Sequence, residues 1–553
     1  MRSPILVFLL LLFLYLLTFG GHFYSPDEEV MFRVTEALAT RGSLAIDPIT
    51  EGFATRPAQP PRPDGREYAQ YGVGQPIAAA PFYWLGRALQ PLASDEAWVF
   101  LDSRLRTIQT IVAPRPALPQ GAALALEAQG LAARLGVSLF NTVLTAFSGM
   151  VLFLLARRLT RSERAAWLAA LAWGAGSMAW PHARTFFSEA FAGLCQLLAF
   201  LALALCFFPK DETGESPETP VRQGRGAWLC FAAGLAAGYG CLVRLDSVLF
   251  LPVLALLVAY GYFPITDFLG SSVRVIDLVK ALGRHLLAPG TEGKARPVFR
   301  LIAFCVPVGL AGGAILAMNW LQYGSLLASG YSDQSEGIQF STPILAGLYG
   351  FTMSIGKGLF FFSPALFLAL WGIGPMLRRQ PVFGAAVLAN FILFLCAMSC
   401  WRNWAGGWCW GPRHIMQIHA LLAVPIAFWV AEGWNGVRRM LFSVLMVVAV
   451  AVQVYGCSQS FFEFYHAYFR DPAPPNAHIL YDPENEMFLA SCYAVYRRDP
   501  QTGQVGERVP LGEILRAPIN DSIYIVQNSQ WTGYAELWRT RGVHDFFWVH
   551  VLE

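Results

Sequence analysis

The sequence predicts an all-α membrane protein with a bundle of about eleven transmembrane helices, and three observations lead to this prediction. Hydrophobic residues make up 55% of the chain and charged residues 14%, with a mean hydropathy of +0.44. Soluble domains carry about 25% charged residues, so this composition indicates a membrane solvent. Apolar stretches recur along the chain, and the links between them are basic on alternate sides.

The predicted spans are apolar stretches long enough to cross the hydrocarbon core as helices. A helix needs about 20 residues for this, because every backbone polar group must be satisfied within the segment. We interpret the first stretch as an uncleaved anchor rather than a signal peptide, since no small-residue cleavage site follows it. The spans lie at about 4–21, 137–156, 165–183, 188–208, 227–244, 247–264, 301–320, 358–376, 382–400, 414–430 and 437–456.

Basic residues set the orientation of these spans. The link after the second span has four arginines within eight residues, and the links after later even-numbered spans are basic as well. Cytoplasmic loops are enriched in Lys and Arg, so we place these links in the cytoplasm and the remaining loops on the extracytoplasmic face. The basic residues are Arg157, Arg158, Arg161, Arg164, Arg274, Lys280, Arg284, Lys294, Arg296, Arg300, Arg378, Arg379, Arg438 and Arg439.

The chain is expected to form two parts. Residues 1–456 form a transmembrane domain with a long extracytoplasmic loop at 22–136. Residues 457–553 form a small mixed extracytoplasmic domain, because this tail is polar and ends in two strand-like runs, 522–526 and 546–551. The net charge of +3 is too close to neutral to indicate a nucleic acid as partner.

The long loop should begin with two helices on the membrane surface. Ser25 suits the N-cap of the first helix, Pro26 its first position and Glu28 its third, which together form a capping box. The apolar residues that follow suit an amphipathic helix ending at Gly42. A second helix is expected from the Gly/Pro-rich stretch at 71–76 to about residue 89.

This order of elements resembles the GT-C superfamily of membrane glycosyltransferases, which includes protein O-mannosyltransferases and bacterial aminoarabinose transferases. The resemblance covers about residues 1–456. One departure is Arg244-Leu245-Asp246, where the family usually has Arg-Pro-Asp. The segments that carry the resemblance are Tyr24-Ser-Pro-Asp-Glu-Glu-Val30, Tyr71-Gly-Val-Gly-Gln-Pro76, Phe187-Ser-Glu-Ala190, Leu242-Val-Arg-Leu-Asp246, Ser354-Ile-Gly-Lys-Gly-Leu-Phe-Phe-Phe-Ser-Pro364 and Gly407-Trp-Cys-Trp-Gly-Pro-Arg413.

The resemblance implies an inverting hexosyl- or pentosyltransferase that moves a sugar from a polyprenyl-phosphate donor to a hydroxyl of an extracytoplasmic glycan, lipid or protein. Such a reaction needs a carboxylate to take the acceptor's proton, cations to receive the charge left on phosphate, and a groove for the lipid. The active site would lie on the extracytoplasmic side of a cell membrane. No cofactor is indicated with certainty, and the residues leave open whether a divalent metal takes part.

Asp27, Glu28 and Glu189 are the candidate acids. An acid in the first turn of a helix also favours the helix dipole by about 0.3–1 kcal/mol. Glu28 fits that role as the capping-box partner of Ser25, so we expect Asp27 to be the base and Glu28→Gln to lower stability more than activity. Glu189 stands at the mouth of an apolar span, where an ionised group is usually paired or functional. It would position the acceptor or help to hold a metal, or else serve only as a helix-start charge.

Lys357 and Arg413 are expected to bind the donor phosphate, with Arg244 as a third candidate. Glycines on both sides of Lys357 would let a phosphate approach, and the planar fork of Arg413 suits phosphate oxygens. If both bind one phosphate, their replacements should be non-additive. Alternatively, both could snorkel to the interface, and Arg244 could simply pair with Asp246. An aromatic belt explains the nearby tryptophans, Trp401, Trp404, Trp408 and Trp410.

A transporter or flippase of lipid-linked sugars is the main alternative, since it would also span the membrane and carry polar residues at span ends. Transporters tend to place charges near mid-membrane and to contain internal repeats. The sequence has neither feature, and a first loop of over a hundred residues suits an enzyme better. The ten cysteines form no C-x-x-C pair and no zinc-binding spacing.

Overall fold

The structure of the chain is a computed structural model, and its described part is mostly helical. The predictions on Trp408 and on a strand at 522–526 lie outside the described residues, as does most of the predicted C-terminal domain. The structure describes residues 2–47, 55–105, 122–208, 223–261, 280–281, 283–285, 296–331, 340, 342–401, 403–407, 409–461, 464, 495–498, 505–509, 529–542 and 545–552.

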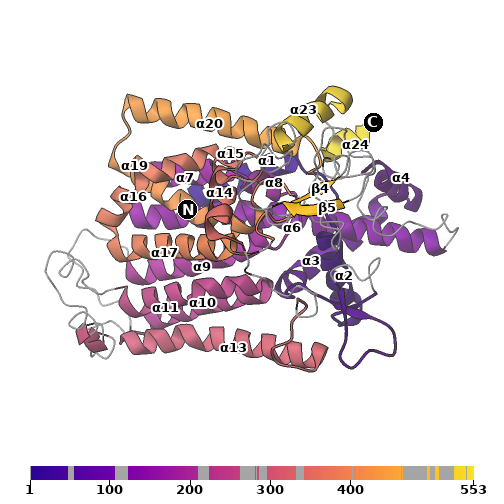
Figure 1. Ribbon diagram of the computed structural model, residues 1–553, viewed down its shortest axis with the longest axis horizontal. Helices are drawn as coiled ribbons and strands as arrows, with labels where there is room; N and C mark the ends of the chain where they lie inside the picture. The colour runs from indigo at the N-terminus through magenta and orange to yellow at the C-terminus, as the bar shows by residue number, and fades with distance from the viewer. Residues whose placement is uncertain are drawn as a thin grey trace.

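In the described part of the chain, 7 helical segments are long and apolar enough to cross a membrane. Figure 1 shows the long helices running nearly parallel to one another as a bundle. One of the segments, Arg413–Glu432, is a run of short helices: η6 (Arg413–Ile415), α18 (Met416–His419), η7 (Ala420–Leu422) and α19 (Ala423–Glu432). The others lie in α6 (Ala122–Thr160), α9 (Glu189–Phe207), α10 (Gln223–Val243), α13 (Pro297–Tyr323), α17 (Pro381–Ser399) and α20 (Gly436–Cys457).

The remaining predicted spans coincide with shorter or interrupted helices. Ser363 illustrates one interruption, because it has a non-helical backbone directly before Pro364, which cannot donate a backbone hydrogen bond. A further apolar helix, α14 (Ile344–Met353), lies in the loop predicted at about 321–357. The shorter helix is α1 (Arg2–Leu17), and the interrupted ones are α7 (Glu163–Gly174) with α8 (Ala179–His182), η3 (Leu245–Phe250) with α11 (Leu251–Tyr260), and α15 (Leu359–Phe362) with η5 (Pro364–Phe367) and α16 (Leu368–Arg379).

The first loop forms a layer of short elements at one end of the bundle (Figure 1, right). Both predicted helices are present, because α2 ends at Gly42 in a left-handed cap and α3 covers the second predicted range. A three-stranded antiparallel sheet in the order β1-β3-β2 lies between them in sequence. The elements are α2 (Pro26–Arg41), β1 (Ala45–Ile46), β2 (Thr55–Pro57), β3 (Glu67–Ala69), α3 (Gly74–Leu89), η2 (Gln90–Leu92) and α4 (Asp95–Leu105).

Close backbone packing holds α3 on α6. A Cβ atom at Gly136 would lie 2.6 Å from the Cα of Gly86, and one at Gly86 would lie 2.2 Å from the carbonyl oxygen of Ala132. Any side chain at either glycine would therefore push α3 away from α6. Because α2 packs against α3, this contact also fixes the start of α2 relative to the bundle.

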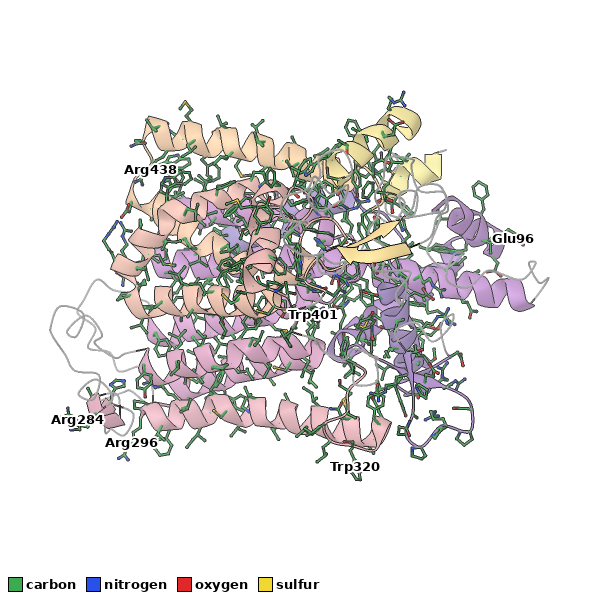
Figure 2. The ribbon with its side chains drawn as sticks, viewed as in Figure 1. Glu96, Arg284, Arg296, Trp320, Trp401 and Arg438 are labelled. Carbon is green, nitrogen blue, oxygen red and sulfur yellow. The ribbon has the colours of Figure 1, made fainter. Side chains whose placement is uncertain are left out.

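The two ends of the bundle differ in their charged residues. Arg284, Arg296 and Arg438 lie at the end opposite the first-loop helices, whereas Glu96 lies on the far side of those helices (Figure 2). The labelled basic residues, which come from two of the predicted basic links, therefore lie at one end of the molecule, as their alternation along the sequence predicts.

The end of the tail differs from its prediction. The sequence predicts a strand at 546–551, but α24 (Phe547–Leu552) occupies this range and follows α23 (Gln530–Arg541). This apolar segment packs on the end of α1 instead, where the N–H of Phe547 donates to the carbonyl of Phe19 at 2.7 Å. A two-stranded antiparallel sheet, β4 (Val495–Arg498) and β5 (Val505–Val509), precedes both helices.

Candidate active site

Helix α2 begins with three acidic residues, Asp27, Glu28 and Glu29, and each has a different environment. Glu29 is buried in ion pairs with Arg33 and Arg134, at 3.0 and 2.9 Å. Glu28 is fully buried. The side chain of Asp27 is 21% exposed. Asp27 is therefore the acid of this turn that a substrate can reach.

Glu28 does not form the predicted capping box. Ser25 is the N-cap of α2, but its hydroxyl accepts no bond from the helix and instead donates to Glu28 Oε1 at 3.4 Å. Glu28 Oε2 accepts a hydrogen bond from the backbone N–H of Phe186 at 2.8 Å. The carboxyl thus joins the start of α2 to the turn before α9. Burial raises the pKa of Glu28 to about 8, although its backbone hydrogen bonds and the charge of Arg413 lower it.

The wild-type protein should become less stable as the pH rises, and we expect Glu28→Gln to be free of this pH dependence. An acid with a raised pKa in the folded state makes the free energy of unfolding fall between its ordinary value, 4.5, and about 8. Each unit of difference corresponds to about 1.4 kcal/mol. Glutamine mimics the neutral acid, so above neutral pH the variant should be the more stable protein, the reverse of the sequence-based expectation. Thermal unfolding in nanodiscs from about pH 5 to about pH 9 measures this. Parallel curves for the two proteins would contradict it.

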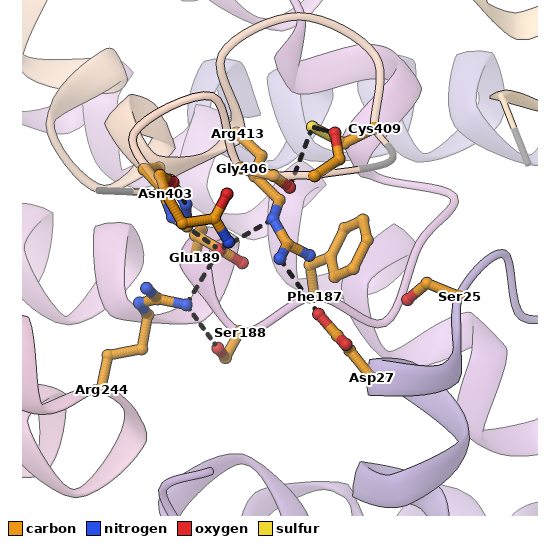
Figure 3. Close-up of polar contacts among 12 residues, drawn as sticks. Ser25, Asp27, Phe187, Ser188, Glu189, Arg244, Asn403, Gly406, Cys409 and Arg413 are labelled. Carbon is orange, nitrogen blue, oxygen red and sulfur yellow. Dashed lines mark hydrogen bonds and ion pairs between the residues drawn. The ribbon is translucent and has the colours of Figure 1, made fainter. Parts of the chain in front are cut away.

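Arg413 lies between Asp27 and Glu189 and contacts both (Figure 3). Its Nη2 donates to Asp27 Oδ2 at 3.0 Å, and its Nε lies 3.7 Å from Glu189 Oε1. The guanidinium carbon also lies 4.4 Å from the centre of the Phe187 ring. Arg413 therefore joins the first loop to the start of α9.

Arg244 contacts Glu189 from the other side. Its Nη1 donates to Glu189 Oε1 at 2.8 Å, while Nη2 and Nε donate to Asp246 at 2.9 to 3.2 Å. Gln417 Nε2 donates to Asp246 Oδ1 at 2.9 Å. The five charged residues form a continuous series, Asp27–Arg413–Glu189–Arg244–Asp246, which we call the ion-pair chain.

The ion-pair chain distinguishes its carboxylates from one another. Glu189 is 2% exposed and lies between two guanidinium groups, so it is suited to hold Arg413 and Arg244 in place. Asp27 stands at one end of the chain and contacts a single guanidinium, that of Arg413. The phenol of Tyr71 lies beside Asp27. The pKa of Tyr71 is raised well above its usual value, mainly by burial and then by the charge of Asp27 and the hydrogen bond with it.

A cavity of about 330 Å³ adjoins the Arg244 end of the ion-pair chain. Ser188, Arg244 and Asp246 supply charged and polar groups to its lining. Much of the remaining wall is apolar and comes from α10, η3 and α13, including Leu242, Val248, Leu249, Ile315 and Met318. Arg244 is the one predicted phosphate ligand that lines this cavity, since neither Lys357 nor Arg413 does.

Lys357 does not have the environment of a phosphate ligand. Its side chain is buried, and Nζ donates to the backbone carbonyls of Gly407, Cys409 and Gly411 at 3.0, 2.9 and 3.3 Å. Nζ also lies 3.1 Å from Cys409 Sγ, so the acceptors of this one segment outnumber the three hydrogens that the ammonium can donate. We therefore replace the predicted phosphate contact with a structural role for Lys357 in the segment before Arg413.

The segment that Lys357 holds is the glycine loop, residues 403–413. Gly406, Gly407 and Gly411 have φ angles of +76°, +63° and +65°, which favour glycine. These turns direct several carbonyl groups toward one point, where the ammonium of Lys357 lies. Because the loop leads directly into Arg413, Lys357 helps to position that guanidinium.

Replacing Lys357 with methionine should lower turnover by about 10²-fold, because the loop carbonyls lose the cation that orients Arg413. Lys357→Ala leaves space for a small cation, so added ethylammonium should restore part of the turnover. Lys280 is exposed at the opposite end of the molecule, and Lys280→Met is the matched control. A direct phosphate contact would instead raise the KM for the donor together with the loss of turnover, whereas a structural role should leave that KM nearly unchanged.

Two site residues were not predicted from the sequence. Tyr71 lies in a stretch whose glycines and proline predict only a helix entry, so its contact with Asp27 depends on the tertiary fold. Gln417 is fully buried in the Arg413–Glu432 span and bonds both Asp246 and the hydroxyl of Ser247. A polar residue inside an apolar span is a signal that could have identified Gln417.

A divalent cation would have Asp27 and Glu189 as its candidate ligands. No group of three or more His, Cys, Asp or Glu side chains gathers within the described ranges. Asp27 and Glu189, the candidate ligands, are each already paired with a guanidinium group. Such pairing supplies positive charge where a metal would supply it, so we derive no step through a metal.

No protein-family model and no curated protein matches the chain. Among solved structures, it is similar to ArnT from Cupriavidus metallidurans bound to undecaprenyl phosphate, with a TM-score of 0.43 and 13% identity over 98% of this chain and 88% of that one. It is also similar to the oligosaccharyltransferase AglB from Archaeoglobus fulgidus in complex with an inhibitory peptide and a dolichol-phosphate, with a TM-score of 0.44 and 13% identity over 92% of this chain and 61% of that one.

Proposed function

We propose that the chain is a membrane glycosyltransferase, of the hexosyl or pentosyl type, that moves a sugar from a polyprenyl phosphate to an acceptor hydroxyl. The observation that supports this most is the position of the ion-pair chain. A guanidinium near one end borders an apolar cavity between membrane helices, and a part-exposed carboxylate stands at the other end. A ligand for this arrangement has an anionic head and an apolar tail, and a polyprenyl-phosphate sugar has both.

The donor would enter the cavity from the bilayer. Helix α13 forms one wall of the cavity. Only 11% of its apolar 18-residue stretch is buried within the protein, so most of the surface of α13 would meet lipid. The isoprenoid would lie along Ile315 and Met318, with its phosphate beside Arg244. We propose the extracytoplasmic side for this site, because Arg284, Arg296 and Arg438, from two of the basic links, lie at the opposite end of the bundle.

In the proposed step, the acceptor oxygen attacks the anomeric carbon of the sugar as the bond from that carbon to the phosphate oxygen breaks. The electron pair of that bond leaves with the phosphate, and the hydroxyl proton passes to Asp27. Arg244 stabilises the charge that grows on the phosphate, most strongly where water is scarce. Arg413 orients Asp27, and Glu189 holds both arginines. Attack opposite the leaving phosphate inverts the anomeric configuration.

The test uses purified protein in nanodiscs and a polyprenyl-phosphate sugar with separate labels on lipid and sugar. Release of free polyprenyl phosphate, with the sugar appearing on an added glycan, lipid or peptide acceptor, would support the proposal. In sealed vesicles, movement of the intact donor across the bilayer without release would identify a flippase instead. Binding without release or movement would identify a protein that only holds the lipid.

A further inference from the structure

The end of the tail returns to the membrane helices and contacts two parts of the candidate active site. Gln530 Nε2 donates to the carbonyl of Cys409 at 3.1 Å, the same carbonyl that Lys357 binds. Trp531 Nε1 donates to the carbonyl of Ile355 at 2.9 Å, two residues before Lys357. At the other end of the segment, Trp548 Nε1 donates to the carbonyl of Leu17 at 3.0 Å. The tail thus reaches from the glycine loop to the end of α1.

Asp545, between these contacts, forms a buried hydrogen bond with His22 and a buried ion pair with Arg184. Its Oδ1 lies 2.9 Å from His22 Nε2, and its Oδ2 accepts from Arg184 Nη2 at 2.7 Å. All three residues are almost completely buried, at 6%, 2% and 2% exposure for His22, Arg184 and Asp545. Arg184 also donates to the backbone carbonyls of Asp545 and Cys457. Three segments far apart in sequence therefore meet at one carboxylate.

Each partner of Asp545 lies next to a segment of the candidate active site. The His22 ring lies 4.4 Å from the Tyr24 ring, and Tyr24 precedes the turn that carries Asp27. Arg184 starts the stretch in which Phe186 binds the carboxyl of Glu28. The same stretch continues through Phe187, whose ring contacts the guanidinium of Arg413, to Glu189. Asp545 consequently links the segment of the proposed base to the segment of Glu189.

The link between α1 and α2 packs closely against its neighbours at Gly20 and Gly21. Gly21 has a φ of +77°, and a Cβ atom there would lie 2.4 Å from the ring of Phe547. A Cβ at Gly20 would lie 2.0 Å from the hydroxyl of Tyr24. A side chain at Gly21 would therefore clash with the tail, and one at Gly20 would clash with Tyr24.

We infer that the tail segments at 529–542 and 545–552 are part of the active-site scaffold, and that Asp545 is a positioning residue for Asp27 and Glu189. The expected effect of replacing Asp545 on turnover rests on the proposed function, whereas its expected effect on the structure does not. Removing the anion leaves the guanidinium of Arg184 buried without its carboxylate and frees the two site segments to shift. A shift of about 1 Å in a catalytic group can cost about 10²-fold in rate.

The experiment compares Asp545→Asn with Glu536→Gln, which removes a carboxylate from an exposed ion pair on α23 of the same segment. Asp545→Asn should lower kcat by about 10²-fold and change the KM for the donor by less than about threefold, because Asp545 touches neither cavity nor donor. Glu536→Gln should leave both unchanged. Asp545→Glu, which keeps the anion but displaces it, should lie between wild type and Asp545→Asn, and it serves as the test variant if the asparagine protein does not fold.

A second readout does not depend on transfer. Ser25 is 5% exposed, so a cysteine introduced there should react slowly with maleimide in the wild-type and Glu536→Gln backgrounds and at least about tenfold faster with Asp545→Asn. Unchanged labelling of position 25 would overturn the inference whatever the turnover. If the wild-type protein transfers no sugar, faster labelling in Asp545→Asn still supports the scaffold role, and the failure belongs to the proposed function.

Discussion

Replacing Asp27 with asparagine should lower turnover by about 10²–10⁴-fold while the protein remains inserted and folded. Asparagine keeps the size of the side chain and can still accept the hydrogen bond from Arg413, but it cannot take a proton from the acceptor. Asp27 is the acid in the first turn of α2 that is neither fully buried nor held by two arginines. Release of labelled polyprenyl phosphate by purified protein measures the effect.

The matched control for Asp27 is Glu36→Gln, a carboxylate more than two turns further along the same helix. It should retain wild-type turnover, which separates the loss of the proposed base from a general change in the charge of α2. An Asp27→Asn protein with normal thermal stability and near-normal turnover would remove Asp27 from the mechanism.

Arg244→Gln should lower turnover by about 10²–10³-fold, the scale seen when one donor that stabilises a developing negative charge is removed. Arg244 lines the cavity and lies beside the position proposed for the phosphate. The KM for the donor should rise as well, because the guanidinium also attracts the phosphate of the bound donor. Arg244→Lys should rescue only part of the loss, since a point charge cannot replace a planar fork.

Arg244 also neutralises Glu189 and Asp246, so its replacement could act through folding alone. The double variant Arg244→Gln with Asp246→Asn restores the balance of charge without restoring the cation. If this double variant recovered turnover as well as thermal stability, Arg244 would be structural only. Arg62→Gln, which breaks an exposed ion pair with Asp64 in the first loop, is the control and should change neither property.

Much of the bundle could be predicted from the sequence because its helices depend on local composition. Each apolar stretch is helical in the structure, and the start and end of α2 follow from Ser25, Pro26 and Gly42. The same reasoning placed Asp27, Glu189 and the arginines at one end of the bundle. Their direct contacts are new information, since they require α2, α9 and the Arg413–Glu432 span to meet in three dimensions.

The errors have tertiary causes. Lys357 looks like an accessible cation in sequence, but three glycines with positive φ fold a loop around its ammonium. Glu28 has the spacing of a capping box, but the N–H of Phe186, 158 residues away, competes for its carboxyl. The segment predicted as a strand at 546–551 is a helix that packs on α1. The roles assigned to the site residues remain predictions that the variants above test.

The exposure of α13 has a consequence for how the protein should be assayed. A cavity with one wall facing lipid receives its ligand from a two-dimensional solution, so the concentration that matters is the mole fraction of donor in the bilayer. Adding detergent or inert lipid at constant donor molarity should therefore slow the reaction by surface dilution. A half-saturation value quoted per litre of buffer would change with the amount of lipid, whereas one quoted per mole of lipid would not.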